Sequence, residues 1–171
     1  MGGALDRLVA RAEIADVVTR CAMYLDDQYW DPFADLWTDD ASFEVDDEGG
    51  FFGKEAVLEF LTNCLPPGYV SKHLLSQPLI ELDDDGRSAK VRTDVVWITQ
   101  NFETAIVARY NDDFALGDDG RWRIRRRWET TVPYSDAPTP MSDSALQMSE
   151  ATMRPRAKVP PPPTEVSGRS R

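Results

Sequence analysis

Apolar residues near the start of the chain recur at the spacing of an α-helix. They fall at helical intervals, with charged and hydroxyl side chains between them. Such spacing is typical of one long amphipathic helix that buries a single face. The apolar positions of this predicted helix are Ile14, Val17, Val18, Cys21 and Leu25.

Two shorter helices and one strand are expected next. Asp31 suits the position that caps a helix and Pro32 suits the first turn, so a short helix is predicted to run into residues 33–37. Apolar and polar residues alternate in 41–45, which indicates a brief strand before a polar turn that contains glycine. Residues 54–63 carry an apolar stripe and predict a third helix.

The pattern changes to a period of two residues from His73 onward. In 89–97 apolar or β-branched side chains largely alternate with charged ones, as in a half-buried strand. Turns rich in Asp and Gly at 83–86 and 117–120 are typical of hairpins. Further strand-like runs are 79–82, 104–114 and 121–128. Helices followed by an antiparallel meander predict an α+β fold, with the helices on one face of a curved sheet.

The composition of the chain changes after Tyr134. Residues 136–171 hold seven of the twelve prolines, including the run 160–163, and five Lys and Arg against four Asp and Glu. This composition favours an extended tail, so a domain of residues 1–135 and a flexible, proline-rich tail of residues 136–171 are expected. A short helix at 144–148, a proline-rich ligand for a partner and an arm around a neighbouring subunit stay open for this tail.

The net charge of −11 argues against some classes of partner. Nucleic acids and anionic membranes bind basic surfaces, so neither is expected to bind this chain. No apolar run is long enough for a membrane span and no signal pattern opens the chain, so a cytoplasmic location is expected. Two cysteines, Cys21 and Cys64, and one histidine are too few for a disulfide framework or a zinc site.

The single histidine, His73, is the first candidate for chemistry. The unperturbed pKa of histidine lies nearest neutrality of all side chains, which makes it the readiest proton acceptor at neutral pH. Asp26 and Asp27 stand at the end of the first predicted helix. If the fold brings Asp26 to His73, the two form a base and the group that orients it. Otherwise Asp26 ends the helix and His73 is a residue at a strand edge.

The order of these elements, together with several short motifs, resembles the SnoaL-like family of the nuclear transport factor 2-like superfamily. The similarity covers about residues 4–133, and it rests on the order and spacing of motifs that are individually weak. The motifs are residues 5–8 with Ile14, Leu25 and Asp26 with Trp30, residues 36–41, residues 53–56, His73, and residues 119–124 with Arg127.

The resemblance implies a cone-shaped α+β barrel with a deep internal pocket. Three N-terminal helices would pack on a curved, mostly antiparallel sheet. Family members such as scytalone dehydratase, bile-acid 7α-dehydratase and hexachlorocyclohexane dehydrochlorinase carry an Asp–His pair in this pocket, in which the histidine is the general base and the aspartate orients it. Those positions correspond to Asp26 and His73. The resemblance also implies no cofactor, a small apolar or aromatic substrate, and a homo-oligomer, either a trimer or a dimer.

One position departs from the family pattern. Many relatives carry a tyrosine five residues before the aspartate, where this chain has Cys21. Tyr24 precedes Asp26 by two residues, a spacing that points the two side chains of a helix in different directions. The acid partner of the dehydratases is therefore missing from its expected place, whereas proton removal by His73 is unaffected.

Several other residues are candidates for contact with the substrate. Arg127 resembles an arginine that relatives place after the Trp-x-Ile strand, although most arginines of this segment are expected to face solvent or pair with carboxylates. Aromatic residues suit a pocket for a flat apolar substrate, and they also build ordinary cores. The expected substrate contacts are Cys21, Tyr24, Trp30, Phe43, Trp97 and Arg127.

The sequence leaves open whether the reaction is β-elimination, isomerisation or aldol-type ring closure, with dehydratase-like elimination preferred. All three remove a proton from carbon and need a donor for the charge that develops. A polyketide-cyclase-like enzyme would differ in substrate and not in base chemistry. The alternative is a non-catalytic ligand-binding or structural subunit, like the small subunit of a ring-hydroxylating dioxygenase. An open cavity that holds Asp26 and His73 would favour the enzyme, and a cone filled by side chains would favour the subunit.

Overall fold

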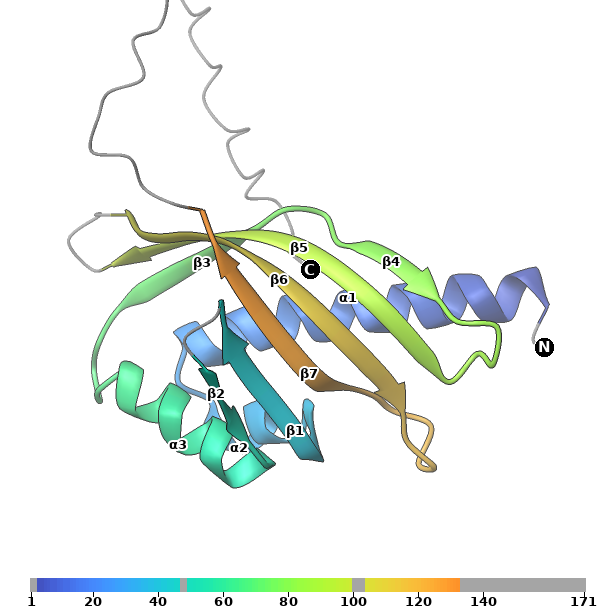
Figure 1. Ribbon diagram of the computed structural model, residues 1–171, viewed down its shortest axis with the longest axis horizontal. Coiled ribbons are helices and arrows are strands. Elements are labelled where there is room, and N and C mark those ends of the chain that lie inside the picture. The colour runs from blue at the N-terminus through green and yellow to red at the C-terminus, as the bar shows by residue number, and fades with distance from the viewer. Residues whose placement is uncertain (1–2, 47–48, 100–103, 133–171) are drawn as a thin grey trace, which may run out of the picture. The chain divides into compact units, whose positions relative to one another are not determined.

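The computed structural model describes residues 3–46, 49–99 and 104–132. The expected tail, residues 136–171, and the short helix expected at 144–148 lie outside these residues. The elements, in chain order, are α1 Ala4–Asp26, α2 Trp30–Ala34, β1 Trp37–Val45, β2 Gly49–Phe52, α3 Lys54–Cys64, β3 Ser71–Leu75, β4 Leu79–Leu82, β5 Ser88–Thr99, β6 Thr104–Leu116 and β7 Trp122–Thr131 (Figure 1).

The seven strands of the described residues form one sheet in the order β2-β1-β7-β6-β5-β3, and β4 pairs with β5. The pairing between β1 and β7 is parallel, and the other strand pairs are antiparallel. The predicted α+β class with a mostly antiparallel curved sheet is confirmed. The predicted alternation in β5 is confirmed as well, because Ala89, Val91, Thr93 and Val95 are all buried.

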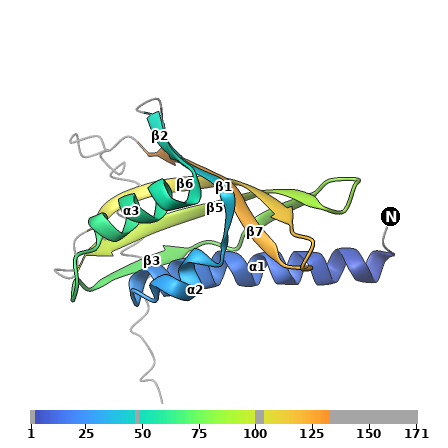
Figure 2. The ribbon, with the colours of Figure 1, turned by 90° about the horizontal axis from the view of Figure 1, so that it is seen from below.

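The helices cover the sheet in two places. Helix α1 contacts β3, β4 and β7, whereas α3 contacts β1 and β2. Figures 1 and 2 show α1 lying lengthwise across the sheet and α3 beside β1 and β2. None of the helices in the described part of the chain is long and apolar enough to cross a membrane.

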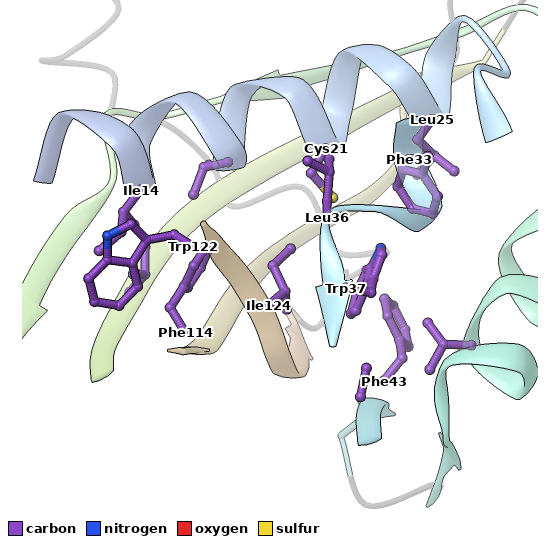
Figure 3. Packing of buried hydrophobic residues seen from close by; sticks show 14 of the residues in the cluster. Ile14, Cys21, Leu25, Phe33, Leu36, Trp37, Phe43, Phe114, Trp122 and Ile124 are labelled. Atoms are coloured by element: carbon purple, nitrogen blue, oxygen red, sulfur yellow. The ribbon is translucent and has the colours of Figure 1, made fainter. Parts of the chain in front are cut away.

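The core forms where the apolar face of α1 meets the strands (Figure 3). Ile14, Val18, Cys21 and Leu25 are buried, which confirms the predicted stripe except for Val17, which is half-buried. Burying such side chains is the main favourable term in folding. The fully buried residues that meet this stripe include Phe33, Trp37, Phe114 and Ile124. The stripe therefore fixes α1 along its length, and with it the position of Asp26 at its end.

Two sequence-based boundaries were wrong near the second helix. Helix α2 begins at Trp30 and the Phe33 N–H donates to the Tyr29 carbonyl at 3.0 Å, so Asp31 lies inside the first turn and does not cap it. The helix ends at Ala34, because Trp37 already pairs with Ile124 of β7 and so begins β1.

The polar turn expected after the first strand contains a strand of its own, β2. Its Gly50 lies against β1, where an added Cβ would stand 2.7 Å from the Phe43 carbonyl oxygen. Only glycine allows this close approach of the two backbones. This glycine-containing segment was therefore located correctly from the sequence, but its assignment as a turn was wrong, because Gly49–Phe52 forms a strand.

A bulge in β7 decides which of its side chains face the core. Ile124 and Arg126 pair with successive residues of β6, so Arg125 is an extra residue without a partner in that ladder. Simple alternation from Ile124 would bury Arg126. The extra residue instead leaves Arg125 and Arg126 exposed and buries Arg127 and Glu129.

The core packing generates a stability prediction for β7. Replacing the fully buried Ile124 by alanine should lower the free energy of unfolding by about 2–5 kcal/mol, because the lost contacts leave a cavity. The neighbouring Arg125→Ala variant serves as control and should change it by no more than about 0.5 kcal/mol, since that side chain is exposed. Urea unfolding of both variants measures the difference, and equal effects would contradict the described packing.

Candidate active site

A cavity of about 560 Å³ is lined by residues from the three helices and the inner face of the sheet. Most of its wall is apolar, and a few polar groups converge on it, as in binding pockets for small molecules. The apolar lining includes Leu25, Phe33, Phe43, Val45, Phe51, Phe60, Leu61, Leu65, Val95, Trp97 and Ile106. The polar lining includes Cys64, His73, Tyr110, Arg127, Glu129 and Thr131.

Asp26 and His73 are in direct contact beside this cavity. Asp26 is the last residue of α1, and its Oδ1 lies 2.7 Å from His73 Nδ1. The His73 backbone N–H also donates to Asp26 Oδ2 at 2.9 Å. Both side chains are buried, with exposed fractions of 3% for Asp26 and 8% for His73. One carboxylate therefore holds both the backbone and the ring of the histidine.

This contact determines the tautomer of the neutral ring. An ionised carboxylate can only accept hydrogen bonds, so the proton of a neutral His73 must sit on Nδ1. Nε2 then carries the free electron pair and can accept a proton. The ring also stacks on Trp97, with centroids 5.9 Å apart and planes inclined by 18°, which fixes its plane.

The end of α1 is tied to the loop that leads into β3. Gln28 adopts a positive φ of 56°, which ends the helical path of the chain. Its side-chain amide donates to the carbonyls of Pro66 at 3.0 Å and Tyr69 at 3.2 Å. The Ser71 hydroxyl donates to Asp26 at 3.4 Å. These bonds hold the start of β3, and so His73, against the end of α1.

Arg127 lines the cavity, but its charge is already matched. It donates to both carboxylate oxygens of Asp112, at 2.9 and 2.7 Å, and both side chains are almost fully buried. Its guanidinium carbon lies 3.9 Å from the centre of the Tyr110 ring. Burial alone would lower the pKa of Arg127, but Asp112 and Cys21 raise it well above its ordinary value. Arg127 is thus a permanent cation that is paired within the protein.

Three of the expected substrate contacts lie outside the cavity lining. Cys21 is in the core, where its sulfur accepts from Arg127 at 3.5 Å, and burial raises the pKa of its thiol despite the opposing effect of Arg127. Tyr24 points elsewhere on α1 than Asp26, and its ring lies 6.3 Å from that of Tyr29. Trp30 packs edge-on against Phe33 in α2. Phe43, Trp97 and Arg127 do line the cavity.

Sequence reasoning missed two buried polar residues of the cavity, Tyr110 and Glu129. They are paired across β6 and β7, and both are buried. Neither side chain has a hydrogen-bond partner within the described ranges. Burial raises the pKa of Tyr110, and burial also raises the pKa of Glu129, with Arg127 and His73 opposing the shift and Asp46 adding to it. A glutamate in an arginine-rich strand looks like a solvent-facing residue, so only the bulge reveals its position.

Comparison with known proteins identifies relatives of this fold. A family model described as SnoaL-like domain matches residues 6–128. No curated protein sequence matches the chain.

Among the described residues no group of three His, Cys, Asp or Glu side chains could hold a metal ion.

Solved structures resemble the chain over most of its length. A scytalone dehydratase-like protein of Novosphingobium aromaticivorans has a TM-score of 0.68 at 20% identity, covering 79% of this chain and 92% of that one. The hexachlorocyclohexane dehydrochlorinase LinA-type3 of Novosphingobium barchaimii has a TM-score of 0.66 at 22% identity, covering 80% and 96%. ActVI-ORFA of Streptomyces coelicolor has a TM-score of 0.61 at 17% identity, covering 70% and 95%. At these identities the similarity shows a shared fold.

The buried ion pair generates a prediction about stability. Asp112→Ala should lower the free energy of unfolding by about 3–5 kcal/mol, because it leaves the Arg127 charge buried without a partner. The next residue, Asp113, offers a matched control, since its pair with Lys90 is much more exposed. Asp113→Ala should cost no more than about 1 kcal/mol. Denaturant unfolding that ranks the two variants equally would contradict the buried pair.

The raised pKa of Glu129 generates a prediction about pH. An ionised Glu129 is disfavoured in the fold, so wild type should lose stability relative to Glu129→Gln as the pH rises from 4.5, the ordinary value, through the raised pKa. Glu44→Gln should show the opposite sign. A hydrogen bond from Arg126 lowers the pKa of Glu44, so wild type should gain stability over that variant as the pH rises. Unfolding curves at several pH values measure both, and a Glu129→Gln difference that does not vary with pH would contradict the assignment.

Proposed function

We propose that this chain, which belongs to the SnoaL-like domain family, is a cofactor-independent lyase that acts on a small apolar, cyclic substrate. Asp26 and His73 remove a proton from carbon in this proposal, and dehydratase-like elimination is the preferred reaction. The observation that carries the proposal is the 2.7 Å contact between the two side chains at the wall of an apolar cavity.

The division of roles follows from the contact. Asp26 holds the proton of His73 on Nδ1, so Nε2 is the atom that accepts the substrate proton. As the ring gains a positive charge, the carboxylate beside it stabilises that charge, and the stacked Trp97 keeps the ring in place. General base catalysis by a positioned side chain typically contributes about 10²–10⁴ in rate.

We propose Trp97 as the donor for the charge that develops on the substrate. Trp97 lines the cavity, and its indole N–H is buried without a hydrogen-bond partner among the described residues. A fixed donor in a largely apolar site stabilises developing negative charge strongly, because little water competes with it. Trp97 is therefore assigned to this role, in addition to its packing against His73.

The cavity supports an enzyme over the structural alternative. A cone filled by side chains would favour a non-catalytic subunit, whereas a cavity of about 560 Å³ is large enough for a small cyclic molecule. Two of the similar structures are named for a dehydratase and a dehydrochlorinase, which are elimination activities. The homo-oligomer and the cytoplasmic location remain predictions from the sequence.

Benzisoxazoles test the proposed base without knowledge of the natural substrate. These flat apolar molecules open when a base removes their ring proton, and the phenolate product is coloured. His73→Ala should lower kcat/KM for a nitro-substituted benzisoxazole by about 10²–10⁴. Asp26→Asn should lower it by a smaller factor, since the base remains but loses its orientation.

The control is Leu74→Ala, because Leu74 is an exposed neighbour of His73 that does not line this cavity. This variant should keep wild-type turnover. If His73→Ala and wild type turn the probe over equally, or if neither does, the proposed base is contradicted. Binding without turnover in all four proteins would instead support a ligand-binding function.

A further inference from the structure

Glu129 is a buried acid that the packing of the protein does not account for. Its exposed fraction is 6%, and it lies on the wall of the cavity. The other buried acids of the described residues, Asp26 and Asp112, each have a partner, His73 and Arg127 respectively. In the described residues Glu129 has neither a hydrogen bond nor an ion pair through its carboxyl. Such a group destabilises the fold, so it is a candidate for a function instead.

The nearest cation does not neutralise Glu129. Arg127 lies on the same strand and on the same face, but Asp112 occupies it through two hydrogen bonds. Burial therefore outweighs the attraction of Arg127 and raises the pKa of Glu129. Such an environment makes the neutral form of a carboxyl group more accessible than it is in water, and the neutral form can donate a proton.

We infer that Glu129 is the general acid of the reaction proposed above, so that its carboxyl gives a proton to the leaving group while His73 takes a proton from carbon. This inference rests on the proposed function, and it supplies the acid partner whose usual position is occupied by Cys21. Both side chains line the same cavity, and they come from strands on different parts of its wall, β7 and β3.

The step balances with these two groups alone. His73 Nε2 takes a proton from a substrate carbon, and the electrons of that C–H bond form the new C=C bond. The bond to the leaving group breaks, and the leaving oxygen takes the Glu129 proton and departs as water. His73 is then positively charged and Glu129 is negatively charged. After the product leaves, His73 releases its proton to solvent and Glu129 takes one from solvent, which restores both groups.

Tyr110 is a second cavity residue whose hydroxyl has no hydrogen-bond partner among the described residues. Tyr110 lines the same cavity as Glu129, but burial raises its pKa further above that of a carboxylic acid. A phenol of this kind donates a hydrogen bond well and a whole proton poorly near neutral pH. Glu129 is therefore the stronger candidate, and Tyr110 is the alternative that an experiment must distinguish.

The inference predicts a pH dependence of the reaction rate. Turnover needs a neutral Glu129 and a neutral His73 at the same time, so the rate should fall at high pH as Glu129 loses its proton. Glu129→Gln should lack this fall in rate at high pH. The titratable or charged groups that act on Glu129 or are acted on by it are Arg127 of β7, Tyr110 of β6, His73 of β3, Cys64 of α3 and Asp46 after β1.

Infrared difference spectroscopy tests the protonation of Glu129 directly and needs no substrate. At neutral pH wild type should show the C=O stretching band of a protonated carboxylic acid, and Glu129→Gln should lack it. Glu44→Gln is the matched control and should keep the band, since Glu44 is held ionised by Arg126. Identical bands in wild type and Glu129→Gln would show an ionised Glu129 and overturn the inference.

Benzisoxazoles with leaving phenolates of different basicity test the chemical role. Glu129→Gln should slow the least activated probe by at least about 10²-fold more than it slows the nitro-substituted probe, because a basic leaving group depends most on the acid. Equal effects on all probes, or a stronger dependence in Tyr110→Phe than in Glu129→Gln, would overturn the inference. A wild type that turns over none of the probes contradicts the proposed function, and the infrared band still decides for or against a protonated Glu129.

Discussion

The buried ion pair between Arg127 and Asp112 joins the apolar core of this protein to its cavity. It contacts α1 through Cys21, β1 through Trp37 and β6 through Tyr110, so three elements meet around one guanidinium group. A charge in such a place is tolerated only with a complete set of partners. The bulge at Arg125 is the backbone feature that turns Arg127 inward to meet them. The same bulge brings Glu129, two residues further along β7, to the cavity wall.

Two carboxyl groups of the cavity region differ in their environments, and this difference gives them different chemistry. Asp26 accepts hydrogen bonds from the backbone and the ring of His73 and from Ser71, so both of its oxygens have donors within the protein. Glu129 receives no such bonds within the described residues and lies in a mostly apolar wall. An acid and a base that coexist at one pH are what a proton-coupled elimination requires. The proposed reaction therefore follows from the unequal hydrogen bonding of two buried carboxyl groups rather than from unusual residues.

The parts of the fold that could be predicted are those with a local signal. The stripe of α1 and the alternation of β5 are periodic, and the structure buries the same faces. The contact between Asp26 and His73 was expected from the family resemblance, because no local rule relates residues so far apart in the chain. The inward position of Arg127 was expected only from the family resemblance, and that of Glu129 was not expected, since the bulge depends on the register with β6. The role of Gly50 could not be predicted for the same reason. A side chain is excluded at this position only because the backbone of β2 lies close to that of β1.

The central claim is that Asp26 fixes His73 as a base with its free electron pair on Nε2. Because the chain has a single histidine, the ¹⁵N resonances of the labelled protein report on this ring alone. The account predicts that, at a pH where the ring is neutral, the proton resides on Nδ1 in wild type, and that Asp26→Asn weakens this preference. A proton on Nε2 in wild type, or a tautomer that Asp26→Asn leaves unchanged, would contradict it.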